Sequence, residues 1–537
     1  MMNADSLFLN GKIYTVDPGF SIAEALAVRD GKILWVGSNE QVKKHAGKET
    51  RIFDLKGRTV IPGLVESHLH FLPYGELLLQ INAFQKTKEE ILAEVKSAYE
   101  KREPGEWILG RGWNELCWEE KTLPSREELD AVAPDVPVCL VRVCGHTSWV
   151  NSKALEVSGI SKETQNPVGG EIFRDSQGEP TGVLTDTAAH PIRRLIPPLT
   201  DSKKSEAYQA AQKDFFSHGF TSVHDMAANI GYDYGTIEFM KKLYQEGVMQ
   251  IGICAYVAAP HAPAAYEVGA ETGLFEDRFS VRGIKFFGDG SLGARSAWML
   301  EDYSDRAGHC GNGRFSDEEL YSMIVEARRN GFQVITHAIG DAANRQVLDV
   351  YERVLKEVPE PKDHRFRIEH AQILAQEDIT RFAALGVIPS MQFVHCSSDK
   401  NMTEDRIGAA RLKGAFVWRQ LLDLGLIIPG GSDAPVELVN PFHGMYAAVT
   451  RKDREGLPEG GWCADQKISR IEALKSFTIW GAYAGFDERT KGSIEVGKYA
   501  DFAVLDRDIL HCPEDAIKDT VVTATVLRGH VVYGEVE

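Results

Sequence analysis

The chain has 537 residues, of which 43% are hydrophobic and 26% charged, and it carries a net charge of −18. This length predicts one large domain plus a smaller module in a soluble globular enzyme. The acidic balance argues against a nucleic-acid partner, which would require a basic face. The sequence shows no membrane-length apolar stretch, no signal peptide at its start and too few cysteines, eight, for a disulfide scaffold. We therefore expect a cytoplasmic protein without a membrane partner.

Both ends of the chain predict short strands separated by turns. Asn10-Gly11 and Asp30-Gly31 are turn signals between β-prone runs. The strand-like runs are residues 7–16, 25–28, 32–36, 500–505 and 525–533. Two strands are marginal by themselves, so we expect the ends to meet in one small composite β-sandwich of residues 1–61 and 488–537.

Between the two ends, apolar strands alternate with helical stretches. The predicted strands are the run ending at His70 and residues 219–225, 250–257, 281–287, 333–337, 366–370, 386–392 and 427–433. The predicted helices include residues 317–330, 341–356 and 376–385. Eight strands in this rhythm predict an α/β fold, a (β/α)₈ TIM barrel over residues 62–487.

Residues from about 72 to 205 break this rhythm and are too long for a βα loop. We interpret them as an insertion after barrel strand 1. Because they leave the carboxyl end of a strand, we expect them on the catalytic face, where they can wall a pocket.

Several candidate metal ligands end predicted strands. His68 and His70 are two residues apart, so both imidazoles can point the same way from one strand. His337, His370 and Asp433 each end a strand of their own. A parallel barrel gathers the carboxyl ends of its strands on one face, so these side chains are expected to converge on a hydrolytic metal centre. Any one of these histidines alone could instead be structural.

Lys285 lies within an apolar strand, where an ammonium is costly unless it is paired or neutralised. It could pair with an acid such as Asp289. Alternatively, burial could lower the pKa of its amine, which could then react with carbon dioxide to give a carbamate that bridges two cations. The residues alone leave both alternatives open.

Asp433 also has two interpretations. Residues 432–435 are typical of a helix start, with Asp433 as the N-cap. In a metal site, the same carboxylate could accept a proton from a water whose pKa a cation has lowered, and so act as general base.

The order of these residues resembles the amidohydrolase superfamily, and residues 62–70 (PGLVESHLH) are similar to its opening motif. The branch that contains N-substituted formamide deformylases is the nearer resemblance. It rests on residues 110–113 (GRGW), 145–147 (GHT) with Asn151, 288–296 (GDGSLGARS) and 431–436 (GSDAPV). The resemblance covers nearly the whole chain, and residues 492–501 (GSIEVGKYAD) are similar to a typical closing segment.

The resemblance implies a set of metal ligands. One zinc-like ion would bind His68, His70 and Asp433. A second ion would bind His337 and His370, with carboxylated Lys285 as the bridge. One or two divalent ions are expected, with zinc as the first choice and manganese, iron or nickel as alternatives.

Three residues are candidates for substrate binding. With the resemblance, His146 is a candidate hydrogen-bond donor to a substrate carbonyl, although a structural histidine is the alternative. Arg295 could anchor an acidic or carbonyl group, or pair with Asp289. Trp113 could line an apolar pocket wall or pack in a core. His224-Asp225 end a predicted strand and could serve the site directly or structurally.

These observations favour a metal-dependent hydrolase that cleaves a non-peptide, amide-type carbon–nitrogen bond in a small molecule, with Asp433 as general base. The alternatives are deamination or ester or lactone hydrolysis on the same centre, or a non-catalytic metal-binding regulatory protein. The substrate and the oligomeric state, a homo-oligomer included, stay open.

Overall fold

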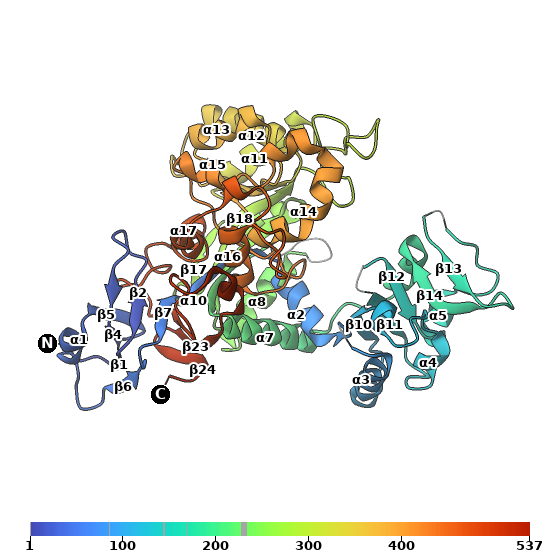
Figure 1. The fold of residues 1–537 in the computed structure, drawn as a ribbon, viewed down its shortest axis with the longest axis horizontal. Coiled ribbons are helices and arrows are strands. Elements are labelled where there is room, and N and C mark those ends of the chain that lie inside the picture. The colour runs from blue at the N-terminus through green and yellow to red at the C-terminus, as the bar shows by residue number, and fades with distance from the viewer. Residues whose placement is uncertain (1, 85, 143–144, 168, 227–232, 537) are drawn as a thin grey trace. The chain divides into compact units, whose positions relative to one another are not determined.

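The computed structural model of the protein describes residues 2–84, 86–142, 145–167, 169–226 and 233–536 (Figure 1). It divides into two compact units. One comprises Met1–Phe71 and Gln212–Glu537, and the other comprises Leu72–Ala211. No helix among the described residues is long and apolar enough to cross a membrane.

The first unit contains a parallel barrel. Seven of its strands pair in chain order, each parallel to the next. They are β8 (Leu64–Leu69), β15 (Phe220–Asp225), β16 (Gly252–Ala258), β18 (Phe279–Phe287), β19 (Gln333–Ala338), β20 (Arg367–His370) and β21 (Ile388–Ser390). The short β17 (Glu271–Gly273) pairs with β18 outside this path. The sequence-based barrel prediction is confirmed.

The eighth predicted strand, residues 427–433, is reduced to a parallel bridge between Met391 and Gly430. Ser67 N–H donates to Gly430 O at 3.0 Å and Asp433 N–H donates to His68 O at 2.8 Å, which closes the barrel between β21 and β8. The glycine at position 431 allows this segment to approach β8 closely. A Cβ atom there would lie 2.5 Å from Glu66 Oε1 and 2.9 Å from His68 N, so no larger residue fits.

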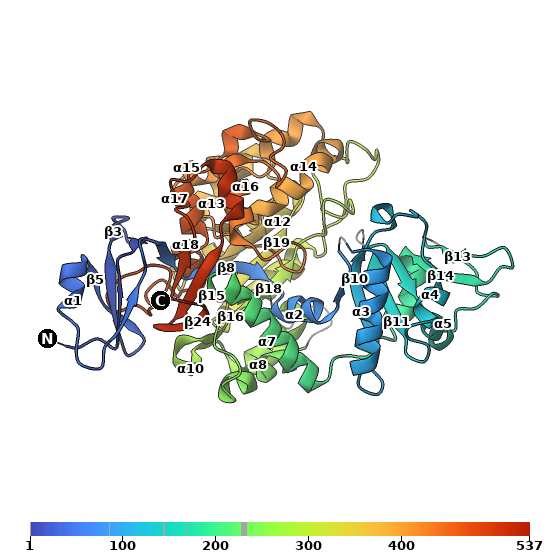
Figure 2. The ribbon, with the colours of Figure 1, turned by 60° about the horizontal axis from the view of Figure 1, so that its bottom comes forward.

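Helices cover the barrel. The three predicted helices are confirmed as α11 (Asp317–Arg329), α12 (Asp341–Glu357) and α13 (Gln376–Leu385). Figure 2 shows α12 beside β19. Its Tyr351 hydroxyl donates to Thr336 Oγ1 at 2.8 Å, which fixes the helix on that strand. The other helices that include residues of this unit are α1 (Asn39–Lys43), α2 (Phe71–Leu79), α7 (Asp201–Ser217), α8 (Gly235–Gln245), α9 (Ala262–Val268), α10 (Leu274–Asp277), α14 (Phe393–Ile407), α15 (Trp418–Asp423), α16 (Pro441–Thr450), α17 (Arg470–Ser476) and α18 (Ile479–Ala484).

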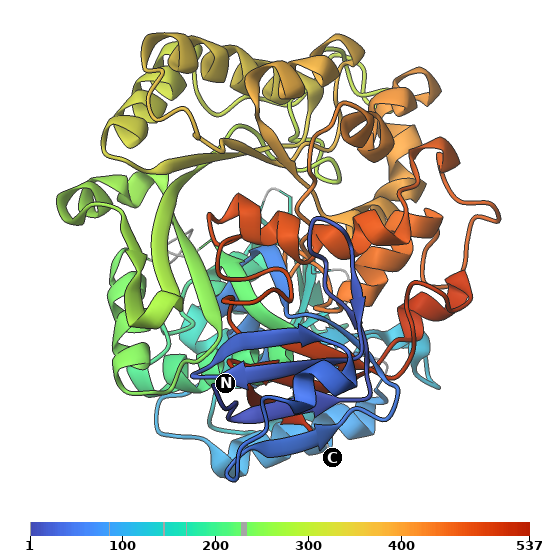
Figure 3. The same ribbon diagram turned by 90° about the vertical axis from the view of Figure 1, so that its left-hand side faces the viewer.

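The two ends of the chain form a β-sandwich, as expected (Figure 3). One sheet has the order β5-β4-β1-β6 and the other β24-β23-β22-β7-β2-β3. The strands are β1 (Ser6–Leu9), β2 (Lys12–Tyr14), β3 (Ile22–Ala23), β4 (Ala25–Arg29), β5 (Lys32–Gly37), β6 (Arg51–Asp54), β7 (Thr59–Pro62), β22 (Phe502–Leu505), β23 (Val522–Leu527) and β24 (His530–Gly534).

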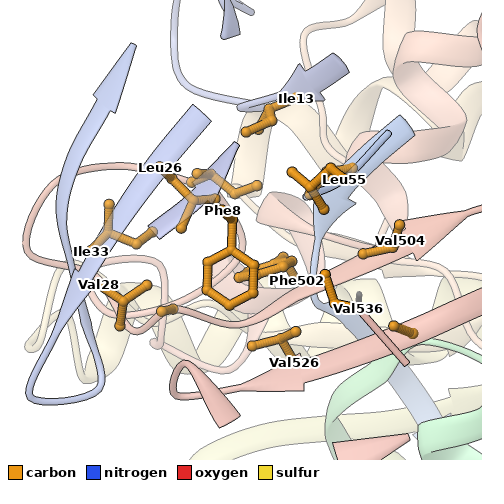
Figure 4. Close-up of a cluster of buried hydrophobic side chains, with 14 of the residues drawn as sticks. Phe8, Ile13, Leu26, Val28, Ile33, Leu55, Phe502, Val504, Val526 and Val536 are labelled. Carbon is orange, nitrogen blue, oxygen red and sulfur yellow. The ribbon is translucent and has the colours of Figure 1, made fainter. Parts of the chain in front are cut away.

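The core of the sandwich joins residues from both ends of the chain. Phe8 packs edge-on against Phe502, with 4.9 Å between ring centroids (Figure 4). Ile13 belongs to the same core. The Asn10-Gly11 turn therefore passes the chain from one sheet to the other, so that β1 and β2 both face the shared interior instead of pairing in a hairpin.

The second unit, Leu72–Ala211, ends slightly beyond the predicted insertion and folds around its own sheet. The sheet has the order β13-β14-β12-β11-β10-β9. Its strands are β9 (Ile81–Asn82), β10 (Ile108–Trp113), β11 (Val138–Arg142), β12 (Thr147–Val150), β13 (Ile172–Arg174) and β14 (Pro180–Thr185). Its helices include α3 (Lys88–Lys101), α4 (Arg126–Asp130), α5 (Ser152–Ser158) and α6 (His190–Arg193). The domain boundaries after residues 61 and 487 stay predictions, as does a pocket wall formed by this unit.

Candidate metal centre

His68, His70 and Asp433 converge at the end of β8. Asp433 Oδ1 lies 3.5 Å from His68 Nε2 and 3.4 Å from His70 Nε2. Two ligands of one tetrahedral zinc ion, each about 2.0–2.2 Å from it, are about 3.3–3.6 Å apart. Asp433 Oδ1 is buried and has no hydrogen-bond partner among the described residues. The spacing and the unpartnered oxygen both fit a shared divalent cation.

Asp433 is held as a carboxylate. Burial disfavours its charge, but its interaction with His70 and the nearby imidazoles of His68 and His370 outweigh burial and keep its pKa well below 3.8. Its backbone φ is +58°, in the left-handed region that non-glycine residues seldom adopt. His370 also has a positive φ, +71°. Such strain is typical of functional sites, where the surrounding structure enforces it.

The alternative interpretation of Asp433 as a helix N-cap is wrong. The next helix, α16, begins at Pro441, and its N-cap is Asn440, whose side chain accepts from Phe442 N–H. Asp433 lies in an irregular segment, where Ser432 N–H donates to Glu66 Oε1 at 2.8 Å. The fully buried Glu66 therefore anchors this segment to β8.

Three of the predicted histidine ligands have their tautomers set by an acceptor behind the ring. His68 Nδ1 donates to Glu369 Oε2 at 2.5 Å, and His370 Nδ1 donates to Gln392 Oε1 at 2.6 Å. His337 Nε2 donates to Gly290 O at 3.1 Å. Each ring thus keeps a lone pair on its opposite nitrogen, which is the arrangement of metal-bound histidines.

Burial also keeps two of these rings neutral. Removal from water, with the charge of Lys285, lowers the pKa of His68 to about 4. Burial, with the neighbouring His337 and His68, lowers the pKa of His370 well below 6.5. Neutral imidazole is the form that binds metal.

Behind His68 lies a buried ion pair that the sequence analysis missed. Arg367 and Glu369 are fully buried, and Arg367 donates to both carboxylate oxygens at 2.7 and 2.9 Å. Burial disfavours the Glu369 carboxylate, but the Arg367 charge and the hydrogen bond from His68 hold its pKa well below 4.5. The available signal was a pair of opposite charges two residues apart, and so on one face, in a strand predicted to be buried in the barrel.

Lys285 reaches the same centre. Its side chain is buried, and its Nζ lies 3.4 Å from His68 Nε2. Burial lowers the pKa of its amine to about 8. The alternative in which Lys285 pairs with Asp289 is wrong, because Asp289 accepts backbone hydrogen bonds from Trp298, Ile339 and Gly340. No carboxylate lies within ion-pair distance of this amine in the part of the chain that the structure describes.

The three predicted substrate-binding residues each have contacts within their own unit. Trp113 is fully buried in the core of the second unit and donates to Leu140 O at 2.8 Å, so the core alternative describes it. His146, also in the second unit, is exposed and pairs with Asp186 at 2.8 Å. Arg295 forms its ion pair with Asp305 rather than Asp289.

The histidine and aspartate that end β15 are both structural supports. His224 Nδ1 accepts from Arg367 at 2.9 Å, and burial and the Arg367 charge lower the pKa of this histidine well below 6.5. Asp225 Oδ1 accepts from Phe71 N–H at 2.9 Å, immediately after His70. Both side chains therefore contact residues that adjoin the predicted ligands.

Similar proteins identify the family of this chain. The sequence pattern of the amidohydrolase family matches residues 51–533. The chain belongs to the amidohydrolase family. It is 34% identical to the YtcJ protein of Bacillus subtilis over 98% of this chain and 99% of that protein. It is 28% identical to the N-substituted formamide deformylase of Arthrobacter pascens over 98% of both chains.

Solved structures of similar proteins have the same fold as this chain. A metal-dependent hydrolase from Pyrococcus furiosus, described as uncharacterised, superimposes with a TM-score of 0.77 at 28% identity. The match covers 94% of this chain and 99% of that one. The resemblance stated from the sequence is thus confirmed at the level of the family and its barrel fold.

Proposed function

We propose that this amidohydrolase is a metal-dependent enzyme that cleaves a non-peptide, amide-type carbon–nitrogen bond in a small molecule. His68, His70 and Asp433 would hold one divalent ion, with zinc as the first choice. His337 and His370 would hold a second, with Lys285 as a carbamate bridging the two. The observation that carries the proposal is the set of acceptors that leaves one lone pair on each of His68, His337 and His370.

When bound, a divalent cation supplies Lewis acidity, which polarises a carbonyl group and lowers the pKa of water. The residues of the chain supply the proton transfers. Asp433, held ionised, accepts the proton of the attacking water. It then returns this proton to the nitrogen of the leaving amine as the carbon–nitrogen bond breaks.

Carboxylation of Lys285 suits its surroundings. A free ammonium at this position would repel cations, whereas a neutral amine would offer them no anionic bridge. The lowered pKa leaves a substantial neutral fraction near pH 8, and the neutral amine is the form that reacts with carbon dioxide. The carbamate would add an anionic group to those of Glu369 and Asp433, whose charges already act on this amine.

The substrate class has its support in one relative. The Arthrobacter pascens protein is named for deformylation of N-substituted formamides, which breaks a carbon–nitrogen bond. The test is a screen of zinc- and manganese-loaded protein against N-formyl, N-acyl and cyclic amides, with esters, lactones and amino-heterocycles as competing classes. Turnover confined to amides supports the proposal. Turnover confined to esters, lactones or heterocyclic amines contradicts it.

A further inference from the structure

A histidine outside the predicted ligand set lies at the same centre. His395 is in the first turn of α14, which follows β21 directly. Its ring lies nearly parallel to that of His370, with 6.1 Å between the centroids and 11° between the planes. Because it lies on a helix rather than at a strand end, the strand-end pattern in the sequence could not identify it.

The position of His395 is fixed by contacts on both sides. Gln392, three residues earlier, binds His370 Nδ1 through its side chain and accepts from His395 N–H at 3.1 Å through its backbone carbonyl. One turn later, Asp399 accepts from Gln372 at 2.7 Å. Gln372 follows His370 closely in sequence. The start of α14 is therefore tied at two points to the segment that carries His370.

The Nε2 atom of His395 is buried and has no hydrogen-bond partner among the described residues. A buried nitrogen without a hydrogen bond is unfavourable, so a bound partner at His395 Nε2 is expected. Asp433 Oδ1 is a second buried atom that has no hydrogen-bond partner in the part of the chain that the structure describes. His370 Nδ1 is already used by Gln392, which leaves its Nε2 for another ligand.

These three side chains are close enough to share an ion. One ligand atom each from His370, His395 and Asp433 lie within 4.8 Å of one another. Two imidazoles and a carboxylate are a common donor set for zinc. The group shares Asp433 with the His68–His70 group, and neither group requires the side chain of Lys285.

We infer that His395 is a further ligand of the metal centre and that it completes, with His370 and Asp433, a binding site for one divalent cation. This inference rests on the proposed function, since it assumes that the centre holds metal. It adds a protein ligand from α14 to the ion that His370 binds. Counting His337, four side chains would then be available to that ion even where Lys285 is not carboxylated.

The test compares zinc binding by the full-length wild-type protein and two variants, using competition with a chromophoric chelator in bicarbonate-free buffer. His395→Phe keeps a ring against His370 but removes the nitrogen, and His395→Gln is the second variant should the first not fold. His530→Gln, an exposed histidine in β24, is the matched control. We expect affinity for one equivalent to fall roughly 10-fold or more in the His395 variants, and to be unchanged in the control.

Cobalt substitution gives an independent readout, because the visible absorption of bound Co²⁺ depends on its ligands. We expect the cobalt spectrum of His395→Phe to differ from that of the wild type. If the wild type binds metal and the folded His395 variants match its affinity and spectrum, the inference is overturned and the proposed function survives. If the wild-type protein binds no metal, both fail.

Discussion

The buried pair behind His68 gives a sharp prediction. Glu369→Gln keeps the size of the side chain but removes its charge. Glu369 Oε2 now accepts from both His68 and Arg367, and Oε1 accepts a second bond from Arg367. A glutamine has only one acceptor oxygen. In either orientation of the amide, its NH₂ group must face an N–H donor of His68 or Arg367. The buried guanidinium of Arg367 also loses the negative charge that balances it.

Two magnitudes follow. Removing one partner of a fully buried ion pair costs about 3–5 kcal/mol of stability, since the remaining charge stays buried. Removing a group that orients a metal-bound histidine costs about 10- to 100-fold in metal affinity. If the amide oxygen takes the Oε2 position, His68 keeps its tautomer, so we expect the lower end of that range.

Metal-free protein is unfolded with urea, and zinc affinity is measured by chelator competition. Glu377→Gln provides the matched control, because Glu377 forms an exposed pair with Arg345, which keeps Asp378 as a partner. That control should lie within about 0.5 kcal/mol of the wild type. A Glu369→Gln protein as stable as this control, with wild-type zinc affinity, would refute the role of the pair.

Three further predictions concern the centre itself. Asp433→Asn should lower turnover by roughly 10²-fold or more, since it removes the proton acceptor, and near-normal turnover would exclude Asp433 as general base. Lys285→Ala should lose the second ion and most activity, and acetate or propionate should restore part of both. An unmodified amine at Lys285 in the fully metallated protein, seen by labelled-bicarbonate NMR, would contradict the carbamate. The metal-free protein should lose stability as the pH falls from about 6.5 to 4. In the unfolded chain His68 takes up a proton with an ordinary pKa of 6.5, whereas in the fold its pKa is about 4. The unfolded state therefore binds more protons in this window, and this group alone contributes about 3 kcal/mol. Urea midpoints that stay constant or rise towards pH 4 would contradict this assignment.

The sequence predicted the parts of the fold that depend on local pattern. Apolar runs such as residues 333–337 became barrel strands because their side chains are buried on both sides of a parallel sheet. The helix starting at Asp317 was predictable from its capping box, in which Ser316 and Glu319 satisfy each other's backbone N–H groups. Convergence of His68, His70 and Asp433 then follows from the barrel topology.

The burial of the missed residues depends on partners from several strands, which the pattern of one strand does not specify. Arg367 binds Ser67, Ser390 and His224 as well as Glu369, so its burial is compensated from several strands at once. Trp113 is a second residue whose surroundings the sequence did not specify. A tryptophan in a glycine-rich segment reads equally well as pocket wall or core, and only the packing around Trp149 and Trp118 decides for the core.

Asp433 shows how the two kinds of information combine. Its sequence context is typical of a helix start, yet the helix begins only at Pro441. The reason lies in the closure of the barrel. Gly431 brings the chain against Glu66 and His68, and Asp433 N–H donates to His68 O. These contacts hold the segment against β8, so a helix does not begin here. The same closure places the Asp433 carboxylate within 3.5 Å of His68 in β8 and of His70, which follows that strand. The hydrogen bonds that close the barrel between this segment and β8 therefore also bring Asp433 to the two histidines. The same hydrogen bonds hold the backbone of Asp433 at its positive φ.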